Sequence, residues 1–368
     1  MKKLLFILLA LTLVALPLFG ACAPEEEPPP PEDGEEPPPP PEPETIKLGF
    51  VHIFPATHYS AVDQFPSYFK MVEEATEGKY ILDIEYYPVG TLLGGAEIYD
   101  GVVKGIADSG QSSFGYNPGR FPVMLTNNQS GIAPPENSDA AAHAIWEFYN
   151  KYKPAELEDV KVLYLYATGP GWIHSHTPIT SVEDMEGLII RVTGAGVRGV
   201  DAVKGEAVAT PMGEVLIAAE KGIIEALVSP AETLEGWKHA EVFHYSTFLP
   251  YFYSEFFYMV MNLNTWNSLP GDLQDAFDAV AEDAMKEAGQ IWQYQQKHGM
   301  DYAIAYDGHE FLYLSDAEVA KLKVLLEPVR GDYIAELNGL GFPGEEIATD
   351  AATITEKYNA LTYEPWTP

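Results

Sequence analysis

The sequence is poor in cysteine and in basic residues, and each shortage excludes a class of protein. Cys22 is the only cysteine among 368 residues, so the chain cannot form an internal disulfide. It carries 21 lysines and arginines against 55 aspartates and glutamates, which gives a formal net charge of −34. Because proteins neutralise nucleic-acid phosphates with lysine and arginine, this balance predicts no nucleic-acid partner.

The sequence also lacks the motifs of common enzyme classes. It contains no Gly-x-Ser-x-Gly turn, phosphate-binding loop or His-Glu-x-x-His zinc helix, and GAGVRG at 194–199 lacks dinucleotide-loop spacing. The aromatic stretch YFYSEFFY at 251–258 is interpreted as a strand and its approach. His174 and His176 are spaced to hold a metal on one strand face, but without an evident third ligand we favour ligand or structural contacts. We therefore expect no enzyme activity, no cofactor and no metal.

The N-terminus has the layout of a secretory signal. Lys2 and Lys3 precede an apolar run over residues 4–19, and Cys22 follows where that run ends. The segment resembles a bacterial lipoprotein signal, in which residues 1–21 are removed and Cys22 is lipidated. The alternative is an ordinary cleaved signal with an incidental cysteine. Either signal predicts an extracytoplasmic protein, and the first predicts one that a lipid anchors to the membrane.

Residues 22–45 are expected to form a tether rather than part of a fold. Residues 24–44 hold eleven prolines and nine acidic residues, which repel one another and offer nothing to bury. No later stretch is long and apolar enough to span a bilayer. A lipid anchor followed by such a tether would hold the folded part off the membrane surface.

From Ile46 onward, the pattern predicts a strand, an amphipathic helix and a second strand, which is the start of a parallel α/β sheet. Two later segments, beginning at Glu97 and Glu214, share one pattern at an offset of 117 residues. Each reads as a short helix that ends at a glycine and turns into a strand. We therefore expect one α/β unit to be used twice, once in each of two lobes.

Several polar and aromatic residues are candidates for ligand contacts. Ser112 and Ser229 occupy equivalent places in the two repeated units, near strand ends, where ligands bind in open α/β sheets. Gln111 precedes the first of these serines. Trp172 lies beside His174 in GPGWIHSHTP, and together they suggest a binding loop.

Arg191 is the sharpest of these candidates. Ile190 and Val192 belong to an apolar run that reads as a buried strand, and Arg191 lies between them with no adjacent acid. A desolvated guanidinium is costly unless an anion pairs with it. The anion is either a distant acidic side chain, which makes Arg191 structural, or a ligand carboxylate, which the planar guanidinium binds through two parallel hydrogen bonds.

Three motifs, taken in order, carry a resemblance to a known family. They are PITSVEDMEGLIIRV, GEVLIAAEKGIIEALVSP and MVMNLNTWNSLPGDLQDAF. The chain resembles the DctP-type extracytoplasmic substrate-binding proteins of TRAP transporters from about Ile46 to about Asn359, nearly the whole predicted folded part.

The resemblance implies an α/β fold of the two-lobed periplasmic-binding-protein type (type II), with a long helix across the hinge. It places residues 46–169 and 255–297 in the first lobe, and residues 170–254 and 298–368 in the second. A long helical pattern from about Gly271 to about Asp307 fits the hinge-spanning helix.

The resemblance also implies a receptor that captures an organic acid outside the membrane and delivers it to a small and a large permease subunit. In the family the strand arginine grips the ligand carboxylate, and Arg191 matches it. Many members carry a second arginine where this chain has Ile173, beside Trp172. A bulkier and more apolar monocarboxylate is therefore expected.

Two other functions are compatible with the same plan. An ABC-type solute-binding lipoprotein also has two lobes. A secreted enzyme on a binding-protein scaffold is a further alternative, because a fold does not fix a function. The enzyme would need a nucleophile or an acid–base pair in the cleft, for which the candidate residues give weak support.

Overall fold

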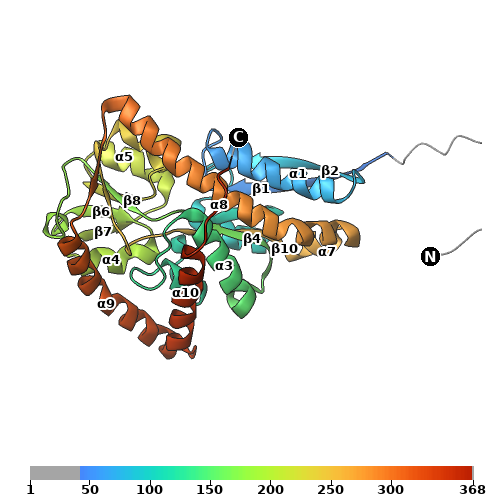
Figure 1. Ribbon diagram of the computed structural model, residues 1–368. Helices are drawn as coiled ribbons and strands as arrows, with labels where there is room; N and C mark the ends of the chain where they lie inside the picture. Colours follow the sequence, from blue (N-terminus) through green and yellow to red (C-terminus); the bar gives the residue numbers. More distant parts are fainter. Residues whose placement is uncertain (1–41, 367–368) are drawn as a thin grey trace, which may run out of the picture. The chain divides into compact units, whose positions relative to one another are not determined.

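The computed structural model describes residues 42–366, and its strands form two separate sheets. The first has the order β2-β1-β3-β10-β4 and the second the order β11-β9-β5-β8-β6-β7. In the first sheet β1 runs parallel to β2 and β3, whereas β10 is antiparallel to both of its neighbours. Each sheet with the helices that cover it is called a lobe below, so the predicted two-lobed α/β fold is confirmed (Figure 1).

The strands are short in the second lobe and longer in the first. The first sheet contains β1 (Glu44–His52), β2 (Tyr80–Tyr87), β3 (Ser109–Ser113), β4 (Val160–Ala167) and β10 (Phe256–Asn262). The second sheet contains β5 (Trp172–Ser175), β6 (Ile189–Val192), β7 (Glu206–Ala209), β8 (Ala226–Ser229), β9 (Tyr245–Phe248) and β11 (Glu310–Tyr313).

Helices cover both sheets and connect them. The α-helices are α1 (Phe65–Ala75), α2 (Ile98–Val103), α3 (Ser138–Tyr152), α4 (Val197–Ala202), α5 (Val215–Glu220), α6 (Thr233–Gly236), α7 (Leu263–Ser268), α8 (Gly271–Asp307), α9 (Asp316–Gly339) and α10 (Gly344–Asn359). Within residues 42–366, no helix combines the length and the apolar character that crossing a bilayer requires.

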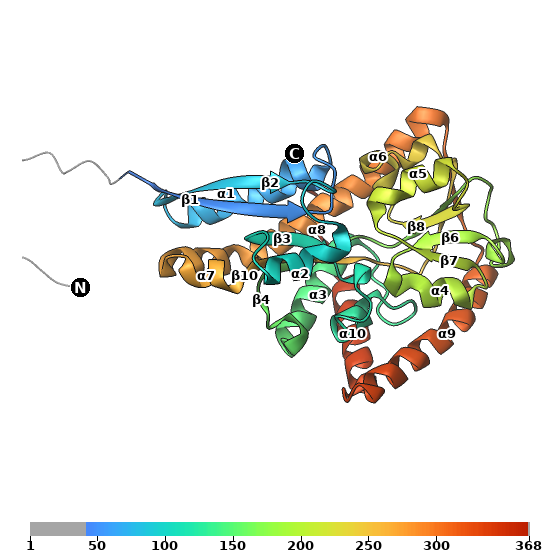
Figure 2. The ribbon, with the colours of Figure 1, turned by 180° about the vertical axis from the view of Figure 1, so that it is seen from behind.

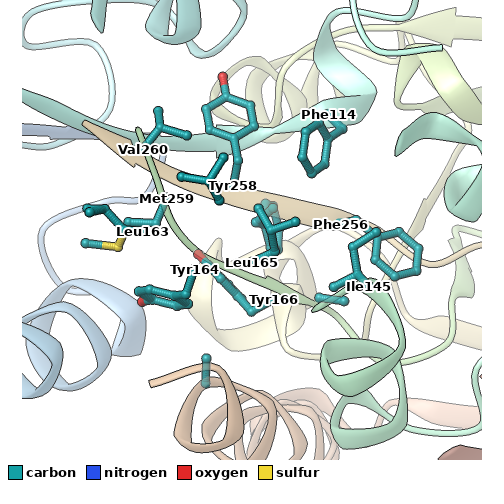
Figure 3. Packing of buried hydrophobic residues seen from close by; sticks show 14 of the residues in the cluster. Phe114, Ile145, Leu163, Tyr164, Leu165, Tyr166, Phe256, Tyr258, Met259 and Val260 are labelled. Carbon is teal, nitrogen blue, oxygen red and sulfur yellow. The ribbon is translucent and has the colours of Figure 1, made fainter. Parts of the chain in front are cut away.

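The core of the first lobe is built on β4 and β10. All seven residues of β10 are buried, which explains its unbroken apolar sequence FFYMVMN. Figure 3 shows Tyr164 and Tyr166 of β4 on one side of these two strands and Tyr258 of β10 on the other. A strand covered on both faces reads as a continuous hydrophobic run rather than as an alternating one.

The repeated unit predicted from the sequence is confirmed. In the first lobe α2 leads into β3, and in the second lobe α5 leads into β8 at the same offset in sequence. Gly105 and Gly222 follow the two helices with φ angles of 74° and 66°. An L-amino acid with a side chain rarely adopts such positive values, so glycine is needed where each helix turns into its strand.

The predicted long helix is also confirmed, because α8 is a single helix of 37 residues. Figure 1 shows it in orange, running from the first lobe to the second. It packs on α1, α3 and β4 in the first lobe and on α6 in the second. A rigid element shared by both lobes limits how they can move relative to each other.

Two connecting segments also cross between the lobes, and hydrogen bonds join them to each other. Residues 168–171 connect β4 to β5, and residues 249–255 connect β9 to β10. The Thr168 N–H donates to the Glu255 carbonyl at 2.8 Å, and the Glu255 N–H donates to Thr168 Oγ1 at 3.0 Å. The Gly171 N–H donates to the Tyr253 carbonyl at 3.0 Å. These paired segments are called the hinge below.

The C-terminal helix packs differently from the lobe assignment expected above. Residues 298–368 were assigned to the second lobe, but α10 packs on α3 and shares the apolar core of the first lobe through Ile347 and Ile354. Figure 2 shows α10 beside α3 and α9 beside α4. The chain therefore returns to the first lobe at its end.

The folded part begins at Glu44, inside the expected tether, and the predicted signal with Cys22 lies outside the described residues.

Candidate functional site

A narrow cavity lies between the lobes, beside the hinge. Parallel strands deliver residues to it from their carboxyl ends, as expected for an open α/β sheet. Ile53 and Phe54 follow β1, Thr193 follows β6 and Pro230 follows β8. The space between these residues is small in the present arrangement of the lobes.

Aromatic rings form most of the wall. They come from both lobes and from the hinge: Phe54, Tyr116, Trp237, Tyr253, Phe257 and Trp292. The polar side chains in the lining are Thr168, Thr193, Glu232 and Glu255. A small number of polar groups within an apolar wall is the usual composition of a small-molecule site.

Arg191 lies next to this cavity at the centre of β6, and its side chain is fully buried. Its Nε donates to the Thr210 carbonyl at 2.9 Å, and Nη2 donates to the same oxygen. Nη1 has no hydrogen-bond partner, and no acidic side chain of residues 42–366 forms an ion pair with Arg191. The Thr210 carbonyl occupies the guanidinium edge formed by Nε and Nη2, so the edge that carries Nη1 is the one left for a ligand carboxylate.

The charge of Arg191 acts on the residues that line the cavity. Burial raises the pKa values of Tyr116, Tyr253 and Glu255, and the positive charge of Arg191 partly offsets each increase. These three side chains come from the first lobe and the hinge, whereas Arg191 belongs to the second lobe. A cation of one lobe therefore acts on the opposite wall.

Three contacts join the lobes around the cavity. The Met212 N–H donates to Tyr116 Oη at 3.1 Å. His58 Nε2 and Glu232 Oε2 lie 2.9 Å apart, and both side chains are buried. Gly194 packs so closely that an added Cβ would lie 2.9 Å from a carbon of Pro118. The lobes are thus in direct contact on more than one side of the cavity.

The other residues predicted from the sequence do not line this cavity. Trp172 packs in the second lobe against Phe248, with ring centroids 5.2 Å apart. His174 is fully buried, and its Nδ1 lies 2.6 Å from Ser246 Oγ. Their contacts are those of a lobe interior.

Ser229, Gln111 and Ser112 lie one layer behind the wall. The Ser229 hydroxyl lies 2.8 Å from Thr233 Oγ1, and it is the next residue, Pro230, that lines the cavity. Gln111 Oε1 accepts from the Ile53 N–H at 3.4 Å, and Ser112 Oγ donates to the Gly95 carbonyl at 2.7 Å. These side chains hold the backbone of lining residues or of their neighbours.

Sequence reasoning missed the residues that the hinge and α8 bring to the cavity. One feature of the sequence could have pointed to Glu255, because it is the only acidic residue within the aromatic stretch YFYSEFFY. Trp237 and Trp292 had no such feature, because a tryptophan in a helical pattern is equally compatible with a core. Both reach the cavity only through tertiary packing.

A second and larger hollow lies against the hinge. Its lining includes Asn128, Pro134 and Tyr251, together with residues of α10 such as Asn359. None of its lining residues is a lysine or an arginine. The interlobe cavity, with a buried cation beside it, is therefore the better candidate for an anionic ligand.

Comparison with known proteins identifies the family. Residues 50–336 match the family model of bacterial extracellular solute-binding proteins, family 7 (DctP). The monocarboxylate 2-oxoacid-binding periplasmic protein of Nostoc sp. (strain PCC 7120) is 26% identical over 232 residues, which are 58% of this chain. The chain spans 60% of the length of this curated relative.

Solved structures show the same fold over whole chains. A TRAP periplasmic solute-binding protein from Desulfovibrio salexigens DSM2638 is 28% identical, with a TM-score of 0.75 over 86% of this chain and 98% of that one. A marine metagenome TRAP solute-binding protein specific for aromatic acid ligands, in complex with metahydroxyphenylacetate, is 25% identical. Its TM-score is 0.80 over 85% of this chain and 99% of that one.

A structural role for His174 predicts a specific pH dependence of stability. Burial, with the nearby His309 as a second cause, lowers the pKa of His174 to about 3. The unfolded chain binds a proton at this position below about pH 6.5, whereas the folded chain does not. The free energy of unfolding that neutral His174 supports is therefore present above that pH and lost as the pH falls.

Urea unfolding of wild type and His174→Asn at pH 7.5 and pH 5 measures this loss. The substitution should destabilise the protein by about 2 kcal/mol less at pH 5 than at pH 7.5, because an unfolded histidine gains about 1.4 kcal/mol per pH unit below its pKa. His176→Asn, two residues away and exposed, should show a much smaller difference. An equal cost at both pH values would show that His174 is not held neutral in the fold.

Proposed function

Because this chain belongs to the DctP family of bacterial extracellular solute-binding proteins, we propose that it captures an organic acid between its lobes and delivers it to a TRAP membrane permease. The permease would consist of one small and one large membrane subunit. Two lobes joined by paired crossing segments and one long helix support this proposal, since such a hinge lets the lobes close around a ligand. A receptor of this kind carries out no reaction on its ligand.

The observation that carries the proposal is the free Nη1 of Arg191. This donor is buried beside an aromatic cavity and has no partner. Leaving a charged donor unpaired in a dry site is costly, and a ligand carboxylate removes that cost. Carboxylates and phosphates are the anionic groups that bind a guanidinium best. Membership of this family favours a carboxylate as the ligand group that Arg191 binds.

The aromatic wall specifies the rest of the ligand. Six aromatic rings favour a flat or apolar body over a sugar acid with many hydroxyl groups. The marine metagenome relative, which binds aromatic acids, supports an aromatic monocarboxylate. The relative from Nostoc supports a 2-oxo acid as the second class to screen.

Removing the Arg191 side chain should abolish tight binding. A buried charge left without its partner costs about 3–5 kcal/mol, so Arg191→Ala should weaken carboxylate binding by about two orders of magnitude or more. Arg191→Lys keeps the charge but cannot both bond the Thr210 carbonyl and occupy the position of Nη1, so it should also bind poorly. Calorimetry with benzoate, phenylacetate and pyruvate measures both effects.

Lys204→Ala is the matched control, because Lys204 is a cation of the same lobe with a largely exposed side chain. Its affinity should equal that of wild type. Arg191→Ala also removes two hydrogen bonds to Thr210, so its melting temperature should fall and affinity is measured on the folded fraction. A folded Arg191→Ala protein that binds the acids normally would make Arg191 purely structural.

Closure of the lobes should depend on the absence of a side chain at residue 194. The added Cβ would meet both a Pro118 carbon and the Gly115 carbonyl, at 2.9 and 3.0 Å. Gly194→Val should therefore hold the lobes apart, and ligand should reduce its radius of gyration less than that of wild type in solution scattering.

Gly119→Val is the control for this experiment. Gly119 lies in the same loop as Pro118, but a Cβ there has no atom within 4 Å. It should close on ligand as wild type does. Equal compaction of wild type and Gly194→Val would mean that the ligand-bound form does not use this contact.

We further propose that Cys22 carries a lipid anchor. A basic start, an apolar run that ends at the single cysteine, and the acidic proline-rich tether after it support this. Cys22→Ser should abolish acylation and release the protein from membranes. Mass spectrometry of the wild-type protein measures the acyl group directly, and its absence would refute the anchor while leaving ligand capture unaffected.

A further inference from the structure

We infer that the ligand carries a hydrogen-bond donor in addition to its carboxylate, and that Oε2 of Glu255 accepts from it. The donor is a hydroxyl or an ammonium group on the ligand body. This inference rests on the proposed function, because it assigns the second polar contact of the same cavity. Arg191 would hold one end of the ligand and Glu255 the other polar group.

Glu255 is the acidic side chain that the hinge brings to the cavity, and it is 3% exposed. Its two oxygens differ sharply. Oε1 accepts from Ser113 Oγ at 2.5 Å, from Asn128 Nδ2 at 2.8 Å and from the Gly115 N–H at 3.2 Å. Oε2 has no partner. One oxygen therefore fixes the side chain, and the other remains free for a ligand.

The first lobe is built to hold this carboxylate in place. A Cβ at Gly115 would lie 2.7 Å and 2.8 Å from its two oxygens, so only glycine lets the backbone approach and donate. All three donors to Oε1 come from the first lobe, and they hold the side chain in one orientation. A rigidly held acceptor can select a ligand by geometry.

No protein group satisfies Oε2 in the described structure. Arg191 acts on Glu255 only through its charge, without an ion pair, and the nearby Thr193 hydroxyl, which also lines the cavity, forms no hydrogen bond to Oε2. Glu232, the other lining acid, is paired with His58. A buried carboxylate oxygen without a hydrogen-bond donor is costly in free energy. A ligand that brings one donor to Oε2 would remove this cost.

The balance of charge points the same way. A simple carboxylate ligand would add a second negative charge near Glu255. Among the described residues in and beside the cavity lining, Arg191 is the only buried cation that could balance these charges. If the ligand also donates a hydrogen bond to Glu255, that bond offsets the repulsion between the two carboxylates. Sites built to bond a polar ligand group discriminate strongly against analogues that lack it.

The test compares three acids that share one ring: benzoate, 3-hydroxybenzoate and 3-(aminomethyl)benzoate. Wild type should bind at least one of the two donor-bearing acids about tenfold or more tightly than benzoate, since a hydrogen bond to a charged acceptor is stronger than a neutral one. Preference for the hydroxyl or for the ammonium acid identifies which donor the site takes. Titration calorimetry at one pH and salt concentration measures all three.

Glu255→Gln tests the atom directly. Its carbonyl oxygen can replace Oε1 and keep the bonds from Ser113, Asn128 and Gly115, which places the amide N–H₂ where Oε2 was. The acceptor becomes a donor without a change of shape. The preference for the donor-bearing acid should disappear, while benzoate should bind at least as tightly as it does to wild type, because the amide carries no negative charge.

Glu287→Gln is the matched control, because Glu287 is a partly buried carboxyl of α8 that accepts from Ser67 and does not line the cavity. It should keep the wild-type preference. The inference is overturned if wild type binds benzoate as tightly as both donor-bearing acids, or if Glu255→Gln keeps the preference. The proposed function survives both results. If no carboxylic acid binds wild type, the proposed function itself fails and the inference falls with it.

Discussion

The hydrogen bonds between the two hinge segments determine what the cavity can contain. Thr168 and Glu255 exchange bonds through backbone and hydroxyl groups, so the backbone of Glu255 is held on both sides. Its carboxylate is then bound by donors of the first lobe, whereas Arg191 is fixed to the second lobe through Thr210. A ligand that contacts both groups therefore bridges the lobes. Closure and recognition are one event in this arrangement, since the bridging contacts form only when the lobes meet.

Much of the fold could be predicted because its signals are local. The repeat needs a glycine at a positive φ angle and an apolar run after it, and both are visible as Gly105 and Gly222 with the strands that follow. The α8 helix has a helical pattern over its full length, with proline before it and Gly308 after it. Arg191 was detectable for a similar reason, because a charged residue within an apolar strand is unusual and requires an anionic partner.

The rest of the site could not be predicted because strand direction and tertiary packing decide it. The residue that reaches the cavity is Pro230, which directly follows β8 and lies one position beyond the predicted Ser229, and successive residues of an extended chain point to opposite sides. Trp292 lies in α8 and Trp237 directly follows α6, and only the folded chain brings both to the cavity. The position of α10 in the first lobe has the same cause, since the sequence of α10 does not indicate that it packs against α3.

The proposed function requires an anionic ligand to bind to a chain whose net charge is −34. Exposed charges separated by more than about 8 Å are largely screened at physiological ionic strength, so most of this charge does not oppose binding at close range. Within the cavity the screening is weaker, and a single buried guanidinium dominates the field that a carboxylate meets. The same weak screening makes Glu255 consequential, because its charge opposes any acid that offers nothing in return. The local arrangement of one cation and one acceptor, rather than the net charge, decides which acids this cavity accepts.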